Sequence, residues 1–591
     1  MSGRSSSASP THAAQALAAL SSHPSNQQLS AEAICPVDTL ELLIDDFFTY
    51  IHPLCPFPHE PSFREAWKRR EDYSNKAFLA LLASMIGALV ASFPRKPKQH
   101  LKTQQREHLF PNHMALVNRC QKICAHARGP GYLESESLNV YDAATSYFLA
   151  LMGIYTFRWR QGRLYFGECL NILRTLGLHK SKSPSNSSGG PPSQHPGHEL
   201  SHNPDVDNIT VEMGRRIFWT MFVSIKSTEQ LGTAFGELVI PPPTPNEPYP
   251  PLPAEMDDFC IFPTHNDPQP QGLLPIIAGF NANCRVFTSY NALSTMESAW
   301  GIDSVIDWDR QKRVLQESLR RCKGSISGLP AELSVTPNPE AMSQQQNGDG
   351  FYPNFGHPGL QPFMSPSGQS THSPHSLEDR RRLQCEIQKA NIHASSLCTR
   401  SYIVEKFWNL TEAHSRARAR KSNSLPGSPT TPTTGLHAAG IDGMIPQVPT
   451  SHYDMTEHEM REEKEAIMRD LLMMLGSINQ VNMEPNADSF VSPIISTVFR
   501  RGKKLTDSQT MKIRLIASTL LDAPNQRKGQ VTPQAQEYLT AFLDMLMKLE
   551  RVGSANSNSG QPEDEEAELR QWADLREYQM KFAQQGSLLG M

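Results

Sequence analysis

The sequence lacks the cysteine arrangement of a disulfide-rich or zinc-stabilised protein. Its ten cysteines are scattered from Cys35 to Cys398, and no signal peptide opens the chain, so we expect a reducing compartment. Only Cys120 and Cys124 lie one helical turn apart, with His126 nearby. Structural zinc sites usually have four ligands. This group therefore favours buried thiols over a metal site.

The sequence also lacks a large net charge of either sign. It lacks the common catalytic motifs as well. The chain has 56 Lys and Arg residues against 60 Asp and Glu, a net charge of -4. Bulk charge therefore gives no sign of the basic face that is typical of a DNA-binding domain. No Gly-x-Ser-x-Gly, His-Glu-x-x-His, P-loop or Gly-x-Gly-x-x-Gly motif occurs in a suitable context. We predict that the chain is not an enzyme and has no catalytic residues, metal ligands or cofactor site.

Long hydrophobic runs are limited to one. Residues 77–93 carry no charge and are rich in alanine, serine and glycine. At about 17 residues, the run falls at the lower edge of a membrane span, which needs roughly 20. Because small residues allow close helix packing, we favour a buried core helix over a membrane span.

What the chain does contain is a series of helical patterns separated by segments rich in proline, serine and glycine. No strand pattern of period two persists, and the 46 prolines must be concentrated between the helices. We predict an all-α protein, with a large irregular helical domain and long disordered insertions and tails.

Composition divides this chain into five parts. In order, they are a disordered tail (1–35), a first helical block (36–331, with a disordered insertion at 181–208), a disordered linker (332–376), a second helical block (377–550, with a disordered insertion at 411–455), and an acidic tail with a short helix (551–591). Neither block shows a self-contained start and finish. We therefore expect the two blocks to share one core.

Residues 209–243 are the most strongly patterned stretch. Apolar residues recur there every four positions, so the helix should be buried on several sides. Arg215 and Arg216 precede the apolar run, which includes Trp219. An arginine beside a buried helix needs a carboxylate or carbonyl partner, because an unpaired buried charge is costly. The alternative for these two arginines is contact with DNA phosphates. Gly232 and the prolines after it end the helix.

A second local signature closes an earlier helix. Leu176, Gly177, Leu178 and His179 stand at its end, where glycine can adopt the left-handed conformation and the leucines can turn back into the core. His179 is better explained as a partly buried histidine at a helix C-terminus than as a ligand contact. Further upstream, 51–58 contains a His-Pro and a Phe-Pro pair after a helical stripe.

These segments resemble the middle regulatory domain, of the xylanolytic-activator type, in fungal zinc binuclear cluster transcription factors. The resemblance lies in the Leu-Gly-Leu-His helix end, the His-Pro and Phe-Pro segment, and the acidic pair Asp257 and Asp258 after the buried helix. Within that helix, the matching positions are Arg215, Arg216, Trp219, Ser227 and Gly232. The chain has Gly-Thr-Ala where the family usually has Gly-Arg-Pro.

The resemblance implies a nuclear protein that regulates transcription by RNA polymerase II in response to a ligand or partner. The family's zinc cluster needs six closely spaced cysteines, because two metals share thiolates, and no window here supplies them. Either a preceding segment is missing from this sequence or the protein has no DNA-reading module of its own. We expect zinc only in relatives that carry the cluster, and DNA contact only through such a module or a partner. The alternative is a helical corepressor or scaffold that does not touch DNA.

Further expectations concern partners and peripheral segments. The expected partners are the transcription machinery or coregulators, with a homodimer left open and no membrane. Arg416, Arg418, Arg420 and Lys421 are candidates for a nuclear import signal. Residues 563–582 mix acidic residues with four apolar ones at helical spacing, as in an activation segment. A docked helix or a solvated acidic tail explains that segment equally well.

Overall fold

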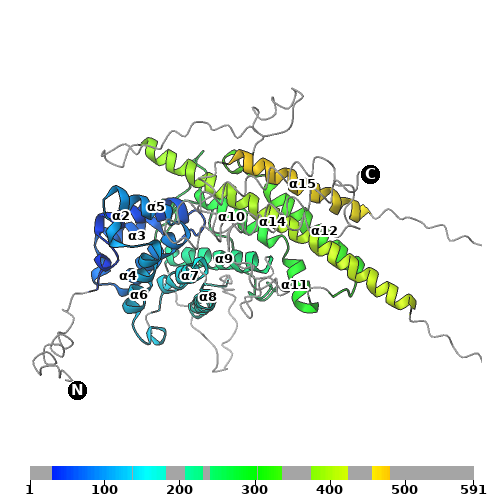
Figure 1. The fold of residues 1–591 in the computed structure, drawn as a ribbon, viewed down its shortest axis with the longest axis horizontal. Coiled ribbons are helices and arrows are strands. Elements are labelled where there is room, and N and C mark those ends of the chain that lie inside the picture. Colours follow the sequence, from blue (N-terminus) through cyan, green and yellow to red (C-terminus); the bar gives the residue numbers. More distant parts are fainter. Residues whose placement is uncertain are drawn as a thin grey trace, which may run out of the picture. The chain divides into compact units, whose positions relative to one another are not determined.

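The computed structural model describes residues 29–135, 138–156, 158–180, 207–230, 240–301, 304–335, 374–423 and 455–478. All of them fall within one compact unit of the chain. Within these ranges the regular structure is entirely helical, and the all-α prediction is confirmed (Figure 1). The expectations for residues 1–28, for the interiors of the insertions and linker, and for 479–591 lie outside the described residues.

The N-terminal helices surround one apolar helix. They are α2 (Val37–Asp46), continued by a π-helical turn (Phe47–Ile51), α3 (Glu60–Lys68), α4 (Lys76–Ser92), α5 (Arg95–Thr103), α6 (His113–Arg128), α7 (Val140–Tyr155) and α8 (Trp159–Thr175). Asparagines cap three of these helices: the side chains of Asn75, Asn112 and Asn139 accept amide hydrogens of the first turns of α4, α6 and α7. α4 packs against both α6 and α7 and is buried from Phe78 onward. The uncharged run is thus the core helix of this bundle.

Among the described residues, no single helix is long and apolar enough to span a membrane. Taken together, α4 and Lys96–Thr103 have the length and composition of a membrane span, but the two segments are bent by 102° relative to each other.

α7 and α8 approach closely because glycines face each other at their contact. A Cβ atom on Gly153 would lie 2.7 Å from the backbone nitrogen of Gly162 and 2.9 Å from its Cα atom. Backbone atoms cannot move aside as a flexible side chain can. Glycine at 153 is therefore required by packing, and its conformation is ordinary helix.

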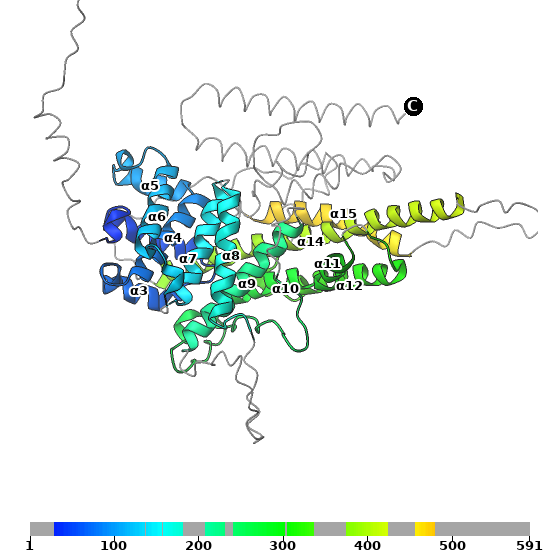
Figure 2. The same cartoon turned by 90° about the horizontal axis from the view of Figure 1, so that it is seen from below.

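The remaining helices assemble around α14. They are α9 (Asn208–Gln230), the short 3-10 helix η6 (Asp258–Cys260), α10 (Ile276–Thr288), α11 (Asn291–Trp300), α12 (Trp308–Ser327), α14 (Pro374–Asn423) and α15 (Met455–Ser477). Figure 1 shows α14 as a long helix beside α10, α12 and α15, which it contacts. Figure 2 shows α9 running between α8 and α10, and α9 contacts both of them.

A buried charge cluster holds α15 against α12 and α14. Arg400 of α14 donates to Glu463 (2.5 Å) and Asp470 (2.6 Å) of α15. Lys323 of α12 lies 2.6 Å from the second oxygen of Glu463. The Glu463 carboxylate is thus matched by two cations, which offsets the cost of its burial.

α14 is longer than the sequence pattern predicts. It begins at Pro374, inside the predicted linker, and continues to Asn423, so the expected start of the second insertion at 411 is wrong. Pro374 is tolerated because the first helical position needs no amide hydrogen. At the other end, the residues after Leu410 are mostly Ala, Arg and other helix-compatible types, with no glycine or proline before Asn423.

Gly153→Ala should lower the free energy of unfolding by about 1–3 kcal/mol, because the added methyl group forces α7 and α8 apart. Gly324→Ala in α12 is the matched control, since nothing lies within 4 Å of the added atom. There, replacing a helical glycine should stabilise the protein by about 0.5–1 kcal/mol. Urea unfolding followed by circular dichroism measures both, and equal stability of the two variants would contradict the packing argument.

Candidate functional site

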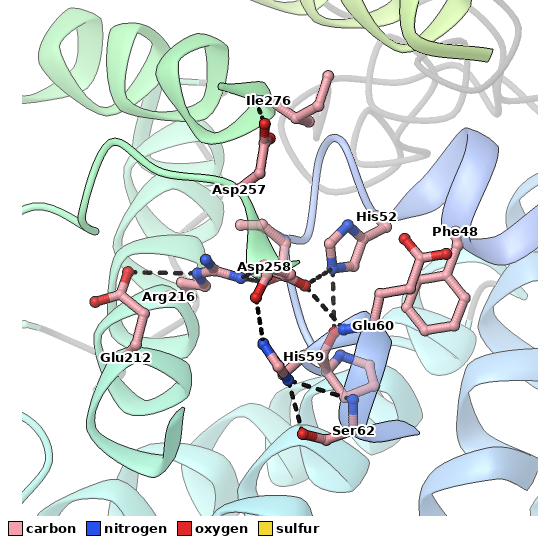
Figure 3. A network of polar contacts seen from close by, with 12 residues as sticks. Phe48, His52, His59, Glu60, Ser62, Glu212, Arg216, Asp257, Asp258 and Ile276 are labelled. Carbon is pink, nitrogen blue, oxygen red and sulfur yellow. Dashed lines mark hydrogen bonds and ion pairs between the residues drawn. The ribbon is translucent and has the colours of Figure 1, made fainter. Parts of the chain in front are cut away.

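Arg216 of α9 is the centre of a polar network inside the protein (Figure 3). Its side chain is only 2% exposed. One terminal nitrogen donates to Asp258 Oδ1 at 2.5 Å and to the Pro56 carbonyl at 3.1 Å, and Nε donates to Glu212 Oε1 at 3.4 Å. A buried guanidinium is tolerated only when it is paired in this way. Arg216 therefore joins α9, the 52–60 segment and η6.

Asp258 collects contacts from the 52–60 segment as well. Its Oδ2 accepts the amide hydrogen of Glu60 at 2.8 Å, and its backbone carbonyl accepts from His59 Nε2, also at 2.8 Å. Burial by itself would raise the pKa of this carboxyl group. Arg216, helped by the nearby His52 and His59 and by the Glu60 amide, instead lowers the pKa of Asp258 to about 2. The carboxylate is therefore charged at neutral pH.

The two histidines of the network have structural contacts. His52 Nε2 donates to the Pro58 carbonyl at 3.1 Å and lies 3.7 Å from Asp258 Oδ2. Burial lowers the pKa of His52, although Asp258 acts in the opposite direction. His59 Nδ1 accepts the amide hydrogen of Ser62 at 3.3 Å and the Ser62 hydroxyl lies 2.8 Å from the same nitrogen.

The Ser62–His59 pair contains the atom types of a nucleophile and a base, but its geometry is that of a helix cap. His59 is the N-cap residue of α3, and Ser62 lies in the first turn. The second ring nitrogen bonds the backbone carbonyl of Asp258, whereas a catalytic triad uses a carboxylate at that position.

α9 also holds the segment that follows it. Glu212 accepts the amide hydrogen of Ala254 at 2.9 Å and lies 3.2 Å from Arg215 Nη1. The Trp219 indole donates to the Pro251 carbonyl at 3.0 Å, and the residue is 5% exposed. The extended 250–258 segment, which contains few backbone hydrogen bonds of its own, is thereby held along α9.

The N-terminal part of α14 joins the same network. Arg381 lies 2.5 Å from Asp257 Oδ2, and the other oxygen of Asp257 accepts the amide hydrogen of Ile276 at 2.9 Å. Arg380 donates to both oxygens of Glu60, at 3.0 and 3.1 Å. Further along α14, Gln384 donates to the Phe48 carbonyl and Gln388 to those of Pro53 and Ile276. α14 therefore bonds both the 48–60 region and the 257–276 region.

The Leu-Gly-Leu-His segment packs against α9 at Gly214. Gly177 has φ 68°, the left-handed conformation expected at a helix end. Leu178 sits against Gly214, where an added Cβ would approach to 2.7 Å. Leu176 and His179 are half-buried, and partial burial lowers the pKa of His179.

Arg416, Arg418 and Arg420 are exposed on the last turns of α14. At 1.5 Å per residue, Arg416 is about 50 Å along the helix from Arg381, so these arginines are remote from the Arg216 network. Gly232 and the side chain of Lys421 lie outside the described residues.

No group of three or more His, Cys, Asp or Glu side chains in the described ranges is arranged to hold a metal ion. Cys120 and Cys124 are buried in the α4–α6 contact region. Burial raises the pKa of Cys124 to about 12 and that of Cys120 well above its ordinary value. Both thiols are protonated at neutral pH, whereas a zinc ligand is a thiolate.

Several residues of the network were absent from the sequence-based candidates: His52, His59, Arg380 and Arg381. The His-Pro pair and the acidic pair were visible as motifs, but nothing in the sequence joins them to Arg216. For Arg380 and Arg381, the signal in the sequence is a run of three arginines at 380–382 in the second helical block. Such a run is equally typical of a helix face exposed to solvent.

In a comparison with protein families, residues 44–224 match the model described as the fungal specific transcription factor domain. No curated protein and no solved structure matches this chain significantly. The match includes His52, His59 and Arg216 but ends before Asp258 and α14. The polar network thus extends beyond the matched residues.

Arg216→Met should lower the free energy of unfolding by about 3–5 kcal/mol, because it leaves Asp258 and Glu212 without their buried cation. Arg215→Met is the matched control: its side chain is 31% exposed and contacts Glu212 from outside, so its loss should cost about 1 kcal/mol or less. Chemical denaturation of both variants tests the assignment. Equal destabilisation would mean that Arg216 is not the central charge.

Proposed function

Since residues 44–224 carry a fungal specific transcription factor domain, we propose that this fungal transcription regulator controls transcription by RNA polymerase II through its helical body. The family match is the observation that carries the proposal. We further propose that a ligand or coregulator acts on this body, in the nucleus, and that specific DNA is reached through another module or a partner.

The Arg216 network supports a regulatory use of the helical body. It ties the matched region to 250–276 and to α14 by charged hydrogen bonds between segments far apart in the chain. Glu60 and Asp257, which pair with α14, adjoin His59 and Asp258 of the network in sequence, so a ligand that displaces the 52–60 segment or η6 would also strain the contacts to α14. These contacts support the proposal that an effect of binding at one segment reaches α14.

The net charge of -4 also fits a second candidate, a helical corepressor or scaffold that does not itself contact DNA. The two candidates differ in their effect on a promoter to which they are tethered. An activating regulator raises transcription, a corepressor lowers it, and a scaffold leaves it unchanged.

The full chain fused to an unrelated DNA-binding domain should raise transcription of a matching reporter. Trp572→Ala together with Phe582→Ala should abolish the increase if the acidic segment presents apolar anchors to a coactivator. Gln571→Ala with Gln579→Ala is the control, since it spares these anchors. Lower or unchanged transcription by the parent fusion would favour the corepressor or the scaffold, respectively, and equal activity of the two double variants would exclude the tail.

We also propose that Arg416, Arg418, Arg420 and Lys421 direct nuclear import. Replacing all four by glutamine should shift a fluorescent fusion of the full chain to the cytoplasm, because import receptors bind such clusters by charge. Arg320→Gln with Arg321→Gln, on the exposed face of α12, controls for lost surface charge. A quadruple variant that still accumulates in the nucleus would assign import to another segment.

A further inference from the structure

α6 and α8 carry one acidic residue between them, and its carboxylate is used in contacts within the helical bundle. α6 contains no Asp or Glu, and α8 contains only Glu168. Glu168 accepts hydrogen bonds from Arg128 of α6 at 2.9 Å and from Ser146 of α7 at 2.6 Å. Arg128 is itself 5% exposed in its side chain and also donates to the carbonyl of Asp142 at 2.6 Å. This pair neutralises itself inside the bundle.

A second arginine bridges the same two helices. Arg158, just before α8, donates to Asn118 Oδ1 at 2.7 Å and Gln121 Oε1 at 2.9 Å, both on α6. Because this bridge and the Arg128–Glu168 bridge follow the same order along both helices, α6 and α8 run in the same direction. The acceptors of Arg158 are neutral amides, so the exposed guanidinium keeps its full charge.

The outer side of α8 adds three exposed arginines, Arg160, Arg163 and Arg174, and α6 adds the exposed Lys122. Within the described part of the chain, none of these four has a carboxylate at ion-pair distance. We call these four residues, together with Arg158, the α6–α8 basic face.

We propose that the α6–α8 basic face binds the phosphodiester backbone of duplex DNA without reading its sequence. Arg160 and Arg174 are about 21 Å apart along α8, a length that corresponds to roughly six base pairs measured along the axis of the duplex. The guanidinium group matches phosphate oxygens in charge and geometry. This contact deepens the proposed function, since it would add affinity to a regulator whose specificity comes from elsewhere.

Duplex DNA fits this face better than an acidic peptide does. Peptide docking depends on apolar anchors that fill pockets. Among the described side chains of α8, the one large apolar side chain that is exposed is Leu164, at 66%. Backbone phosphates need only a row of exposed cations, which is what the face presents.

Fluorescence anisotropy of a labelled 20-base-pair duplex with the full chain tests the proposal. Binding should weaken as salt rises and should be the same for a scrambled duplex. Arg160→Gln with Arg163→Gln should weaken binding several-fold at low salt and reduce the slope of log affinity against log salt by about 2. Arg320→Gln with Arg321→Gln removes the same charge from α12, where both arginines pair with Glu317, and should leave binding unchanged.

Three results would overturn the proposal. They are no binding of the parent chain at low salt, equal weakening by the two double variants, and preferential binding of a polyglutamate peptide, which would point to an acidic protein partner. Thermal unfolding of each variant shows whether it is folded. The reporter fusion brings its own DNA-binding domain, so its failure and failure of this test are independent.

Discussion

The buried guanidinium of Arg216 is the constraint on which the arrangement of the chain depends. A buried charge needs hydrogen-bonding or oppositely charged partners. The partners of Arg216 come from α9 itself, the 52–60 segment and η6. Asp258 in turn bonds the Glu60 amide and His59. One cation thus fixes the relative positions of segments that have little regular structure, and the aromatic packing around Trp219 forms beside it.

The same principle recurs where α14 meets its neighbours. Asp257 and Glu60, next in sequence to residues of the Arg216 network, pair with Arg381 and Arg380, and Arg400 pairs with two carboxylates of α15. Apolar faces alone allow helices to slide, whereas charged pairs have one good geometry. Ion pairs of this kind specify an arrangement more than they add stability. They also join segments that are far apart in the sequence, which supports the proposed regulatory use of the helical body.

Charge is distributed unevenly in this protein, and that matters for its proposed roles. Several carboxylates pair with buried arginines inside the protein, as Glu168 pairs with Arg128. The α6–α8 basic face is left without such compensation although the whole chain carries a net charge of -4. An overall charge near zero is therefore compatible with local contact to an anionic polymer.

The sequence by itself determined the helical class, the buried character of α4 and α9, and the left-handed glycine at 177, because periodicity, capping and glycine conformation are local properties. It also carried the resemblance to fungal transcription factors, which the family match confirmed over residues 44–224. Only the tertiary structure decided that Arg216 meets Asp258, 42 positions away, that Arg381 meets Asp257, and that Arg158 before α8 meets Asn118 and Gln121 of α6. Helix packing brings these residues together, and no local pattern encodes which charges meet.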